Sequence, residues 1–103
     1  VELEVQETQP LPADIGKPGE EDLYKFKAAT AGKYTIETGG ETDLVMKLYG
    51  PDSQTLLIAE DDDSGQGYNP KITADLVAGE YLIQVRHYNT ASGTGSYGIK
   101  VSK

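Results

Sequence analysis

The sequence predicts an all-β domain, built as an antiparallel β-sandwich of about eight strands. Three observations lead to this fold class. Short segments alternate apolar and polar residues with the period of two that half-buried strands show. The 12 Gly and 5 Pro are scattered singly and mark turns between these segments. No segment repeats apolar residues at the helical period, so we expect essentially no helix. A chain of 103 residues has the length of one domain, spanning 1–103.

The first half of the chain contains four candidate strands. Residues 1–15 predict an edge strand and a linker, with the strand at 1–5 and the two prolines of QPLP ending it. Three further segments alternate cleanly and are separated by glycine-containing turns. These segments are 23–28, 33–38 and 43–49.

The second half supplies four more strands. A turn at Gly50-Pro51-Asp52-Ser53 leads into a return strand at 56–59. A hairpin around this turn would place Tyr49 opposite Leu56 and Asp43 near Asp62. The last three strands are expected at 71–76, 81–88 and 96–101. Most connections are too short for the crossovers of a parallel sheet, so the sheets should be antiparallel.

One short pattern recurs three times. Gly is followed by Tyr two residues later and by Ile after two more, in AGKYTI from Ala31, AGEYLI from Ala78 and GSYGI from Gly95. This spacing is the period of a strand. We therefore expect each Tyr to be the first inward residue after a tight turn, with its hydroxyl bonded to backbone near that turn.

Charge and cysteine content limit the partners. The net charge of −8 disfavours nucleic acid and anionic membranes as partners, because both need a basic surface. It permits the binding of cations. The chain contains no Cys, which removes disulfides, thiol nucleophiles and Cys-based zinc sites. No apolar run approaches the length of a membrane span and no signal peptide is evident, but the chain resembles an excised domain. Excess acid without Cys is compatible with secretion and with calcium binding.

Several segments in this order resemble the bacterial pre-peptidase C-terminal domain. They are GEEDLYKFKAATAGKYTIET, DLVMKLYG, LLIAEDDDSGQGYNPKI and AGEYLIQVRHYNTASGTGSYGIKV, and together they cover about residues 16–102. The resemblance implies a sandwich of jelly-roll type. It also implies a non-catalytic domain attached to a secreted peptidase or another exported hydrolase, with the parent catalytic domain in the same chain.

The collagen-binding domains of bacterial collagenases are similar members. They bind calcium through an Asp before the first long strand, which Asp22 matches, and Gly19 stands where they carry a second Asp. Their collagen-binding strip has two outward tyrosines on the long strand, at positions matched here by Arg86 and Tyr88.

A run of acidic residues follows the return strand. In the predicted hairpin Asp43 lies at the same end of the sheet as this run, and carboxylates gathered there repel unless a cation or backbone N–H groups neutralise them. Calcium takes 6–8 oxygen ligands from carboxylates, carbonyls and amides. The candidate ligands are Asp43, Asp61, Asp62, Asp63 and Asn69, with Asp22 from the family resemblance. The alternative is a solvated turn whose Asp and Ser side chains cap backbone N–H groups.

The long strand offers a second candidate site. Its outward residues combine an apolar, an amide, a guanidinium and an aromatic side chain, which can bind a peptide or a sugar. The candidates are Leu82, Gln84, Arg86 and Tyr88, extended by Tyr68 if the acidic loop folds beside them. The alternative is an ordinary exposed strand. Catalysis is not expected, because the only His, His87, has no nucleophile partner in the sequence.

The function expected from the sequence is that of a non-catalytic accessory domain of a secreted hydrolase, most fittingly a peptidase. It would target substrate or stabilise the enzyme, act as a monomer, and bind an extracellular protein fibre or polysaccharide, with calcium supporting the fold. Two alternatives stay open: a carbohydrate-binding module of a secreted glycoside hydrolase, and a structural module of a cell-surface adhesin. The absence of Trp argues against a strong sugar platform, although Tyr can serve.

Overall fold

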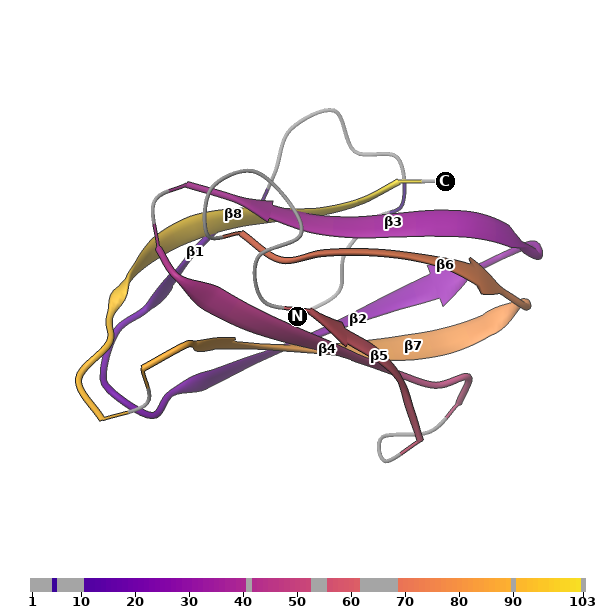
Figure 1. Cartoon of the computed structure of the whole chain (residues 1–103). Coiled ribbons are helices and arrows are strands. Elements are labelled where there is room, and N and C mark those ends of the chain that lie inside the picture. The colour runs from indigo at the N-terminus through magenta and orange to yellow at the C-terminus, as the bar shows by residue number, and fades with distance from the viewer. Residues whose placement is uncertain are drawn as a thin grey trace.

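The chain folds into two antiparallel four-stranded sheets that pack face to face (Figure 1). The computed structural model describes Val5 and residues 11–40, 42–52, 56–61, 69–89 and 91–102. The strands are β1 (Leu11–Ile15), β2 (Glu21–Ala28), β3 (Gly32–Gly39), β4 (Leu44–Tyr49), β5 (Leu57–Asp61), β6 (Lys71–Leu76), β7 (Gly79–His87) and β8 (Gly95–Ser102). The predicted all-β sandwich of about eight strands is confirmed. No helix in the described part of the chain is long and apolar enough to cross a membrane.

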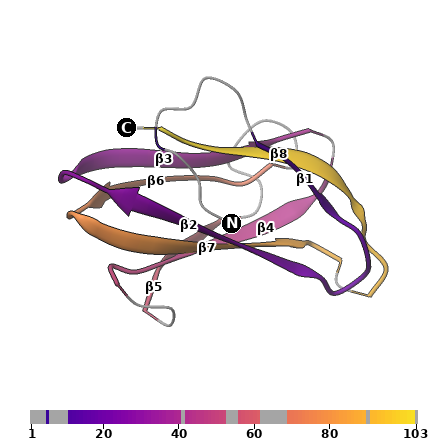
Figure 2. The same ribbon diagram turned by 180° about the vertical axis from the view of Figure 1, so that it is seen from behind.

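The strand order identifies the sandwich as a jelly roll. The back sheet has the order β1-β8-β3-β6 and the front sheet the order β2-β7-β4-β5. Among these neighbours only β4 and β5 follow one another in the chain, so almost every pairing joins distant segments. Figure 2 shows β2 and β7, for example, running side by side in the front sheet. Two interleaved Greek keys of this kind define the jelly roll, which confirms the type that the family resemblance implied.

The segment that the sequence predicts to be a linker contains a strand. β1 pairs with β8 and forms an edge of the back sheet, and it contains Pro12. Proline is tolerated in an edge strand because its missing N–H can face solvent. Pro12 therefore lies inside a strand, within the segment that we expected to be a linker. Val5 makes an isolated parallel bridge to Val101. The rest of the predicted strand at 1–5 lies outside the described residues.

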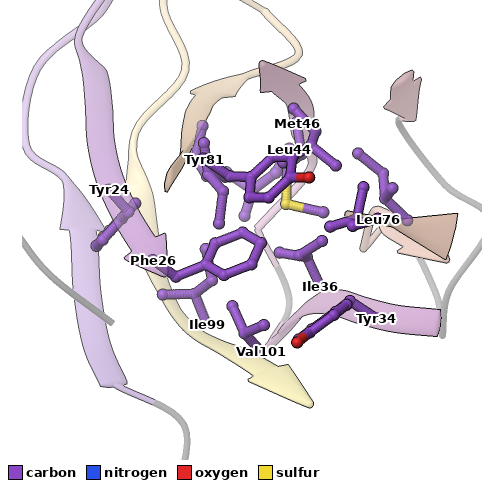
Figure 3. Packing of buried hydrophobic residues seen from close by; sticks show 14 of the residues in the cluster. Tyr24, Phe26, Tyr34, Ile36, Leu44, Met46, Leu76, Tyr81, Ile99 and Val101 are labelled. Atoms are coloured by element: carbon purple, nitrogen blue, oxygen red, sulfur yellow. The ribbon is translucent and has the colours of Figure 1, made fainter. Parts of the chain in front are cut away.

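The inward residues of both sheets form one apolar core (Figure 3). The ring of Phe26 stacks on Tyr81 with centroids 5.3 Å apart and lies 6.1 Å from the ring of Tyr34. Aliphatic side chains from six strands fill the space around these rings, and each contributes roughly 1.5–3 kcal/mol by leaving water. They include Ile15, Ile36, Leu44, Met46, Leu48, Ile72, Leu76, Ile83, Val85, Ile99 and Val101.

Two of the three recurring tyrosines bond to backbone as predicted. Tyr34 donates its hydroxyl hydrogen to the carbonyl of Thr30 at 2.7 Å, and Tyr81 donates to the carbonyl of Val77 at 2.7 Å. Each bond closes a connection that crosses between the sheets, from β2 to β3 and from β6 to β7. Tyr97, in the third copy, instead donates to a side chain of the opposite sheet. The repeated sequence pattern thus predicts the inward ring in all three copies, and the partner of the hydroxyl in two.

The β4–β5 hairpin has a different register from the predicted one. Tyr49 lies opposite Leu57 rather than Leu56, and Met46 lies opposite Asp61. An irregularity beside Leu48 and Tyr49 adds a residue to β5, as a β-bulge does. Asp43 is consequently three positions away from Met46, the residue that faces Asp61.

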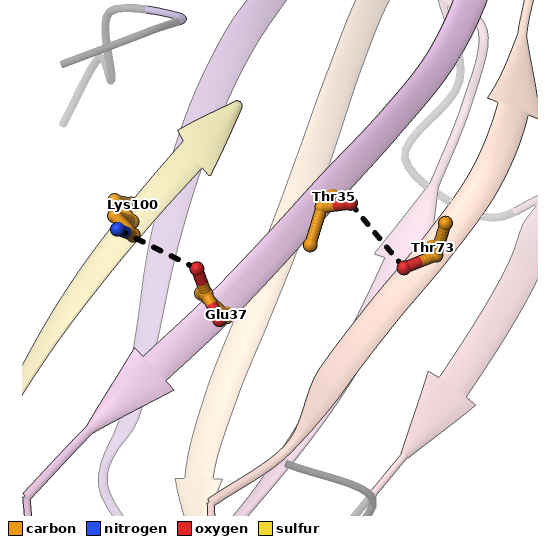
Figure 4. A network of polar contacts seen from close by, with 4 residues as sticks. All are labelled: Thr35, Glu37, Thr73 and Lys100. Atoms are coloured by element: carbon orange, nitrogen blue, oxygen red, sulfur yellow. Dashed lines mark hydrogen bonds and ion pairs between the residues drawn. The ribbon is translucent and has the colours of Figure 1, made fainter. Parts of the chain in front are cut away.

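The outer surface of the back sheet carries polar side chains in rows across the strands (Figure 4). Thr35 on β3 bonds Thr73 on β6 at 3.3 Å, and Glu37 on β3 lies 3.6 Å from Lys100 on β8. The pairing of β3 with β8 continues to Gly39, which lies opposite Gly98. The rows of side chains therefore end in a pair of glycines.

Candidate binding surfaces

The outer surface of the front sheet, which we call the front face, combines apolar and cationic side chains. One row across the sheet consists of Lys25, Leu82, Tyr49 and Leu57, each opposite the next on a neighbouring strand. The row beside it consists of Leu23, Gln84, Lys47 and Glu60. Leu23 is 51% exposed and Leu57 is 46% exposed. The front face therefore presents apolar surface to solvent at both edges of the sheet.

The structure brings only part of the predicted row on β7 to this face. Leu82 and Gln84 lie at its centre, between β2 and β4. The guanidinium of Arg86 donates to the carbonyls of His87 at 3.0 Å and Tyr88 at 3.5 Å, which ties it to the end of its own strand. Tyr88 lies beyond β7 and is 60% exposed. Tyr68 lies outside the described residues.

Sequence reasoning missed the contributions of the neighbouring strands. Tyr49 and Leu57 complete the central row, and Lys25 and Lys47 flank it. Alternation along β4 places Tyr49 on the same side as Lys47, but no local sequence pattern indicates that β4 lies beside β7. In the described part of the chain, neither lysine forms an ion pair.

The described candidates of the acidic loop have structural partners. The carboxylate of Asp61 accepts the N–H of Lys71 at 2.8 Å. The amide of Asn69 accepts the hydroxyl of Thr38 at 3.3 Å and donates to the carbonyl of Gly40 at 2.8 Å. Asn69 is only 4% exposed. Asp62 and Asp63 lie outside the described residues, so the calcium site of the loop stays a prediction.

Asp22 accepts the second of two linked hydrogen bonds, which connect the two sheets. The Tyr97 hydroxyl donates to Oδ2 of Asp22 at 2.6 Å. Since that hydrogen is used, Tyr24 donates its own to the Tyr97 oxygen, at 2.7 Å. Burial raises the pKa of both phenols, so they stay neutral at physiological pH.

The carboxyl group of Asp22 is itself perturbed. Burial raises its pKa above the ordinary value, the Tyr97 hydrogen bond lowers it, and the neighbouring carboxyls of Glu20 and Asp14 raise it again. The net pKa is raised, because the single hydrogen bond does not offset burial and repulsion. These three carboxyls line an open cleft of about 420 Å³ beside β1 and β2.

The described residues form at most part of a calcium site. None of their His, Asp and Glu side chains gather in threes closely enough to hold a metal ion. Calcium takes 6–8 oxygens. Asp22 and Glu20 could supply carboxylate oxygens, and backbone carbonyls or water would have to complete the set.

A second open cleft, of about 830 Å³, lies where β1, β3, β7 and β8 meet at one end of the sandwich. We call it the end cleft. It is lined by Pro12, Ala13, Gly39, Gly40, Thr42, Asp43, His87, Thr94, Gly95, Ser96, Tyr97 and Gly98. Sequence reasoning did not find it, because its residues come from five separate stretches of chain.

His87 is held in one orientation at the end cleft. Its Nδ1 accepts the N–H of Asn89 at 2.9 Å, so the neutral ring carries its hydrogen on Nε2. The ring packs on Gly93, where an added Cβ would lie only 1.9 Å from Nδ1. His87 is therefore a packed and hydrogen-bonded side chain.

The comparisons with known proteins agree with the fold. The sequence model of the bacterial pre-peptidase C-terminal domain matches residues 20–87. The pre-peptidase C-terminal domain of a collagenase from Bacillus anthracis superposes with a TM-score of 0.68 and 19% identity, covering 98% of this chain and 90% of that chain. A search of curated proteins found no significant match.

Two periplasmic inhibitors of g-type lysozyme also share the fold. PliG from Aeromonas hydrophila gives a TM-score of 0.70 at 19% identity, covering 98% of this chain and 94% of that chain. PliG from Salmonella Typhimurium gives 0.64 at 20% identity, covering 99% and 95%. At these identities the superpositions establish a common fold and nothing more specific.

Proposed function

This chain belongs to the bacterial pre-peptidase C-terminal domain family, and from that membership we propose that it is a non-catalytic accessory domain of a secreted hydrolase, most fittingly a peptidase. It acts in the same chain as its catalytic domain, outside the cytoplasm, by holding the enzyme on its substrate. The periplasmic location in the names of the lysozyme inhibitors supports an extracytoplasmic place for the fold.

The front face is the observation that supports a targeting role. Leu82 and Tyr49 lie at its centre, and partly exposed leucines lie at its edges. On soluble monomeric proteins, large contiguous patches of exposed apolar surface mark interaction sites. Lys25 and Lys47, which lack ion pairs in the described structure, favour a partner with carboxylates, in a chain whose net charge is −8. A protein fibre with apolar and acidic side chains meets both requirements.

Retention on insoluble collagen tests the targeting role. We expect the domain to be retained, and the double substitution Tyr49→Ala with Leu82→Ala to reduce retention at least about tenfold, because it removes the centre of the apolar row. Thr35→Ala with Thr73→Ala on the back sheet is the matched control and should leave retention unchanged. No retention of the natural chain, or equal retention of both double variants, would exclude targeting through the front face.

Calcium support of the fold is the second part of the proposal. Burial and neighbouring carboxyls raise the pKa of Asp22, and a divalent cation beside Asp22 and Glu20 would relieve that repulsion. Thermal unfolding with calcium should then show a higher midpoint than with excess chelator. Asp22→Ala should abolish the difference if this site binds the metal, and Asp62→Ala should do so if the acidic loop does. Equal midpoints with calcium and with chelator would exclude both sites.

A further inference from the structure

The backbone conformation does not require glycine at either position of the glycine pair on the back sheet. Gly39 and Gly98 lie opposite each other on β3 and β8, and neither has a positive φ. A Cβ added at Gly39 would meet no atom within 4 Å. Gly98 lies inside β8 and Gly39 is the last residue of β3. Glycine in a strand interior destabilises it by roughly 0.5–1 kcal/mol relative to Ala, and it often marks a bulge, a bend or the close approach of a ligand or another backbone. Packing within the described part of the chain does not account for Gly39.

The glycines leave a bare strip on a face that is otherwise covered. The preceding rows of the back sheet carry Thr35 with Thr73 and Glu37 with Lys100 (Figure 4). The Gly39–Gly98 row continues to Pro12 on β1, which is exposed. Peptide planes are therefore open to solvent there. Gly39, Gly98 and Pro12 all line the end cleft, and we call this strip its floor.

The polar groups around the floor define the ligand chemistry. Of the described residues that line the end cleft, Asp43 is the only one with a charged side chain. His87 offers an Nε2–H donor of fixed tautomer, and Thr94 and Ser96 offer exposed hydroxyls. A carboxylate with no Lys or Arg among the described lining residues disfavours anionic ligands. The volume of about 830 Å³ lies within the range of small-molecule sites, about 300–1,000 Å³.

We propose that the end cleft binds an uncharged, hydroxyl-rich glycan chain, with sugar rings lying over the Gly39–Gly98 strip. The Asp43 carboxylate accepts sugar hydroxyls, and His87 and Ser96 donate to sugar oxygens. Tyr88 follows His87 directly and donates its N–H to the carbonyl of Asp43 at 2.8 Å, so its backbone lies beside these groups, and its ring is largely exposed. Such a ring can pack against the apolar face of a sugar at the margin of the cleft.

A polypeptide ligand fits the end cleft less well. Peptide recognition relies on apolar or aromatic pockets for side chains. The apolar residues lining the end cleft are Pro12, Ala13 and Tyr97, and the Tyr97 ring is buried, with its hydroxyl bonded to Asp22. The front face, which has large apolar side chains, is the better surface for protein. The front face is the outer surface of one sheet, whereas the end cleft lies at one end of the sandwich, so the two can be tested separately.

Titration of the ¹⁵N-labelled domain with soluble glycans tests the proposal. The probes are cellohexaose, xylohexaose, maltohexaose and chitohexaose, and the readout is the amide chemical shifts. At least one probe should move the signals of Gly39, Ser96 and Gly98. Gly39→Leu should weaken its binding at least about tenfold, because the side chain fills open space over the floor without backbone strain. Asp43→Asn, of the same shape, should weaken binding severalfold through the loss of charge.

The control is Gly16→Leu, which adds the same side chain outside the end cleft, where a Cβ makes only an ordinary contact 3.6 Å from Glu20. It should leave glycan binding unchanged. The unfolding midpoint of Gly39→Leu should equal or exceed that of the natural chain, which separates blocking from misfolding. The proposal is overturned if no probe shifts these amides at about 10 mM, a concentration that would reveal even millimolar affinity. It is also overturned if Gly39→Leu binds normally, or if a collagen model peptide alone shifts these amides.

Discussion

Tyr97 on β8 and Asp22 on β2 are joined by a hydrogen bond of 2.6 Å between the phenol hydroxyl and the carboxylate, although they belong to different sheets. The other two tyrosines of the recurring pattern bond to carbonyls four residues earlier in their own segment. Tyr97 thus provides a polar link between the sheets at a margin of the apolar core, and Tyr24 extends it.

The pH dependence of stability should report the state of Asp22. Its pKa in the folded chain is raised above the ordinary 3.8, so folding takes up a proton. The stability contributed by this group is therefore fully present below pH 3.8 and is lost as the pH rises through the folded pKa. Asp22→Asn keeps an acceptor for Tyr97 but has no proton to lose. In urea unfolding with chelator present, the stability of Asp22→Asn relative to the natural chain should rise across this window and then stay constant.

Asp22→Ala is the control for this prediction, because it removes the acceptor as well as the charge. It should be less stable than Asp22→Asn by about 1–2 kcal/mol at neutral pH, since the buried Tyr97 hydroxyl loses its partner. A stability difference between Asp22→Asn and the natural chain that does not change with pH would contradict the raised pKa.

The three tyrosine hydroxyls should differ in their contribution to stability. Tyr34→Phe and Tyr81→Phe each remove one bond to a backbone carbonyl and should lower the free energy of unfolding by about 0.5–1.5 kcal/mol. Tyr97→Phe should cost more, about 1–3 kcal/mol, because Tyr24 loses its acceptor and Asp22 its donor. Urea unfolding of the three variants at one pH measures the order, and an equal loss in all three would argue against the linked chain.

Substitution by alanine should change the stability of the fold in opposite directions at two glycines. Gly50 has φ +140°, and an added Cβ would lie 2.6 Å from the Tyr81 ring, so Gly50→Ala should destabilise the fold by about 2 kcal/mol or more. Gly39→Ala adds its Cβ in open space within a strand and should stabilise by up to about 1 kcal/mol. Unfolding midpoints in urea check both, and a loss of stability in Gly39→Ala would show that the structure itself requires this glycine.

Asn69→Asp separates a structural role from a metal-binding role. The side-chain amide donates to the carbonyl of Gly40, which a carboxylate cannot do, and the site is almost fully buried. The substitution should cost about 1–3 kcal/mol in the free energy of unfolding with chelator present. A calcium ligand at this position would instead make the aspartate variant gain stability when calcium is added. Thermal unfolding with and without calcium distinguishes the two roles.

The strands could be predicted from sequence because each depends on its own alternation. In β2, for example, Tyr24, Phe26 and Ala28 face the core and the lysines between them face solvent. Sheet order was predicted only through the family resemblance, because which strand lies beside β7 depends on packing across the whole chain. The predicted hairpin register was wrong by one position at Tyr49 and by two from Leu48 to Met46, since an extra residue beside Leu48 cannot be recognised from local pattern.

The candidate sites were predicted less well for the same reason. Leu82 and Gln84 were found because they lie on one strand, whereas Tyr49 and Leu57 join them only through strand pairing. The end cleft gathers residues from five stretches of chain, and its floor consists of glycines that read as turn residues in sequence. Asp22 was identified from the resemblance, but its hydrogen bond to Tyr97 spans nearly the whole chain.

The pairing of β1 with β8 has a consequence for the order of folding. Leu11 on β1 pairs with Ile99, which lies near the end of the chain on β8. The same strand, β8, is one of the two neighbours of β3. A nascent chain that lacks residues 95–102 therefore has two open strand edges and a core without Ile99 and Val101. Such non-local pairings place all-β domains among the slow folders, with times of milliseconds to seconds. The domain should consequently fold as one unit, and only after its last strand has been synthesised.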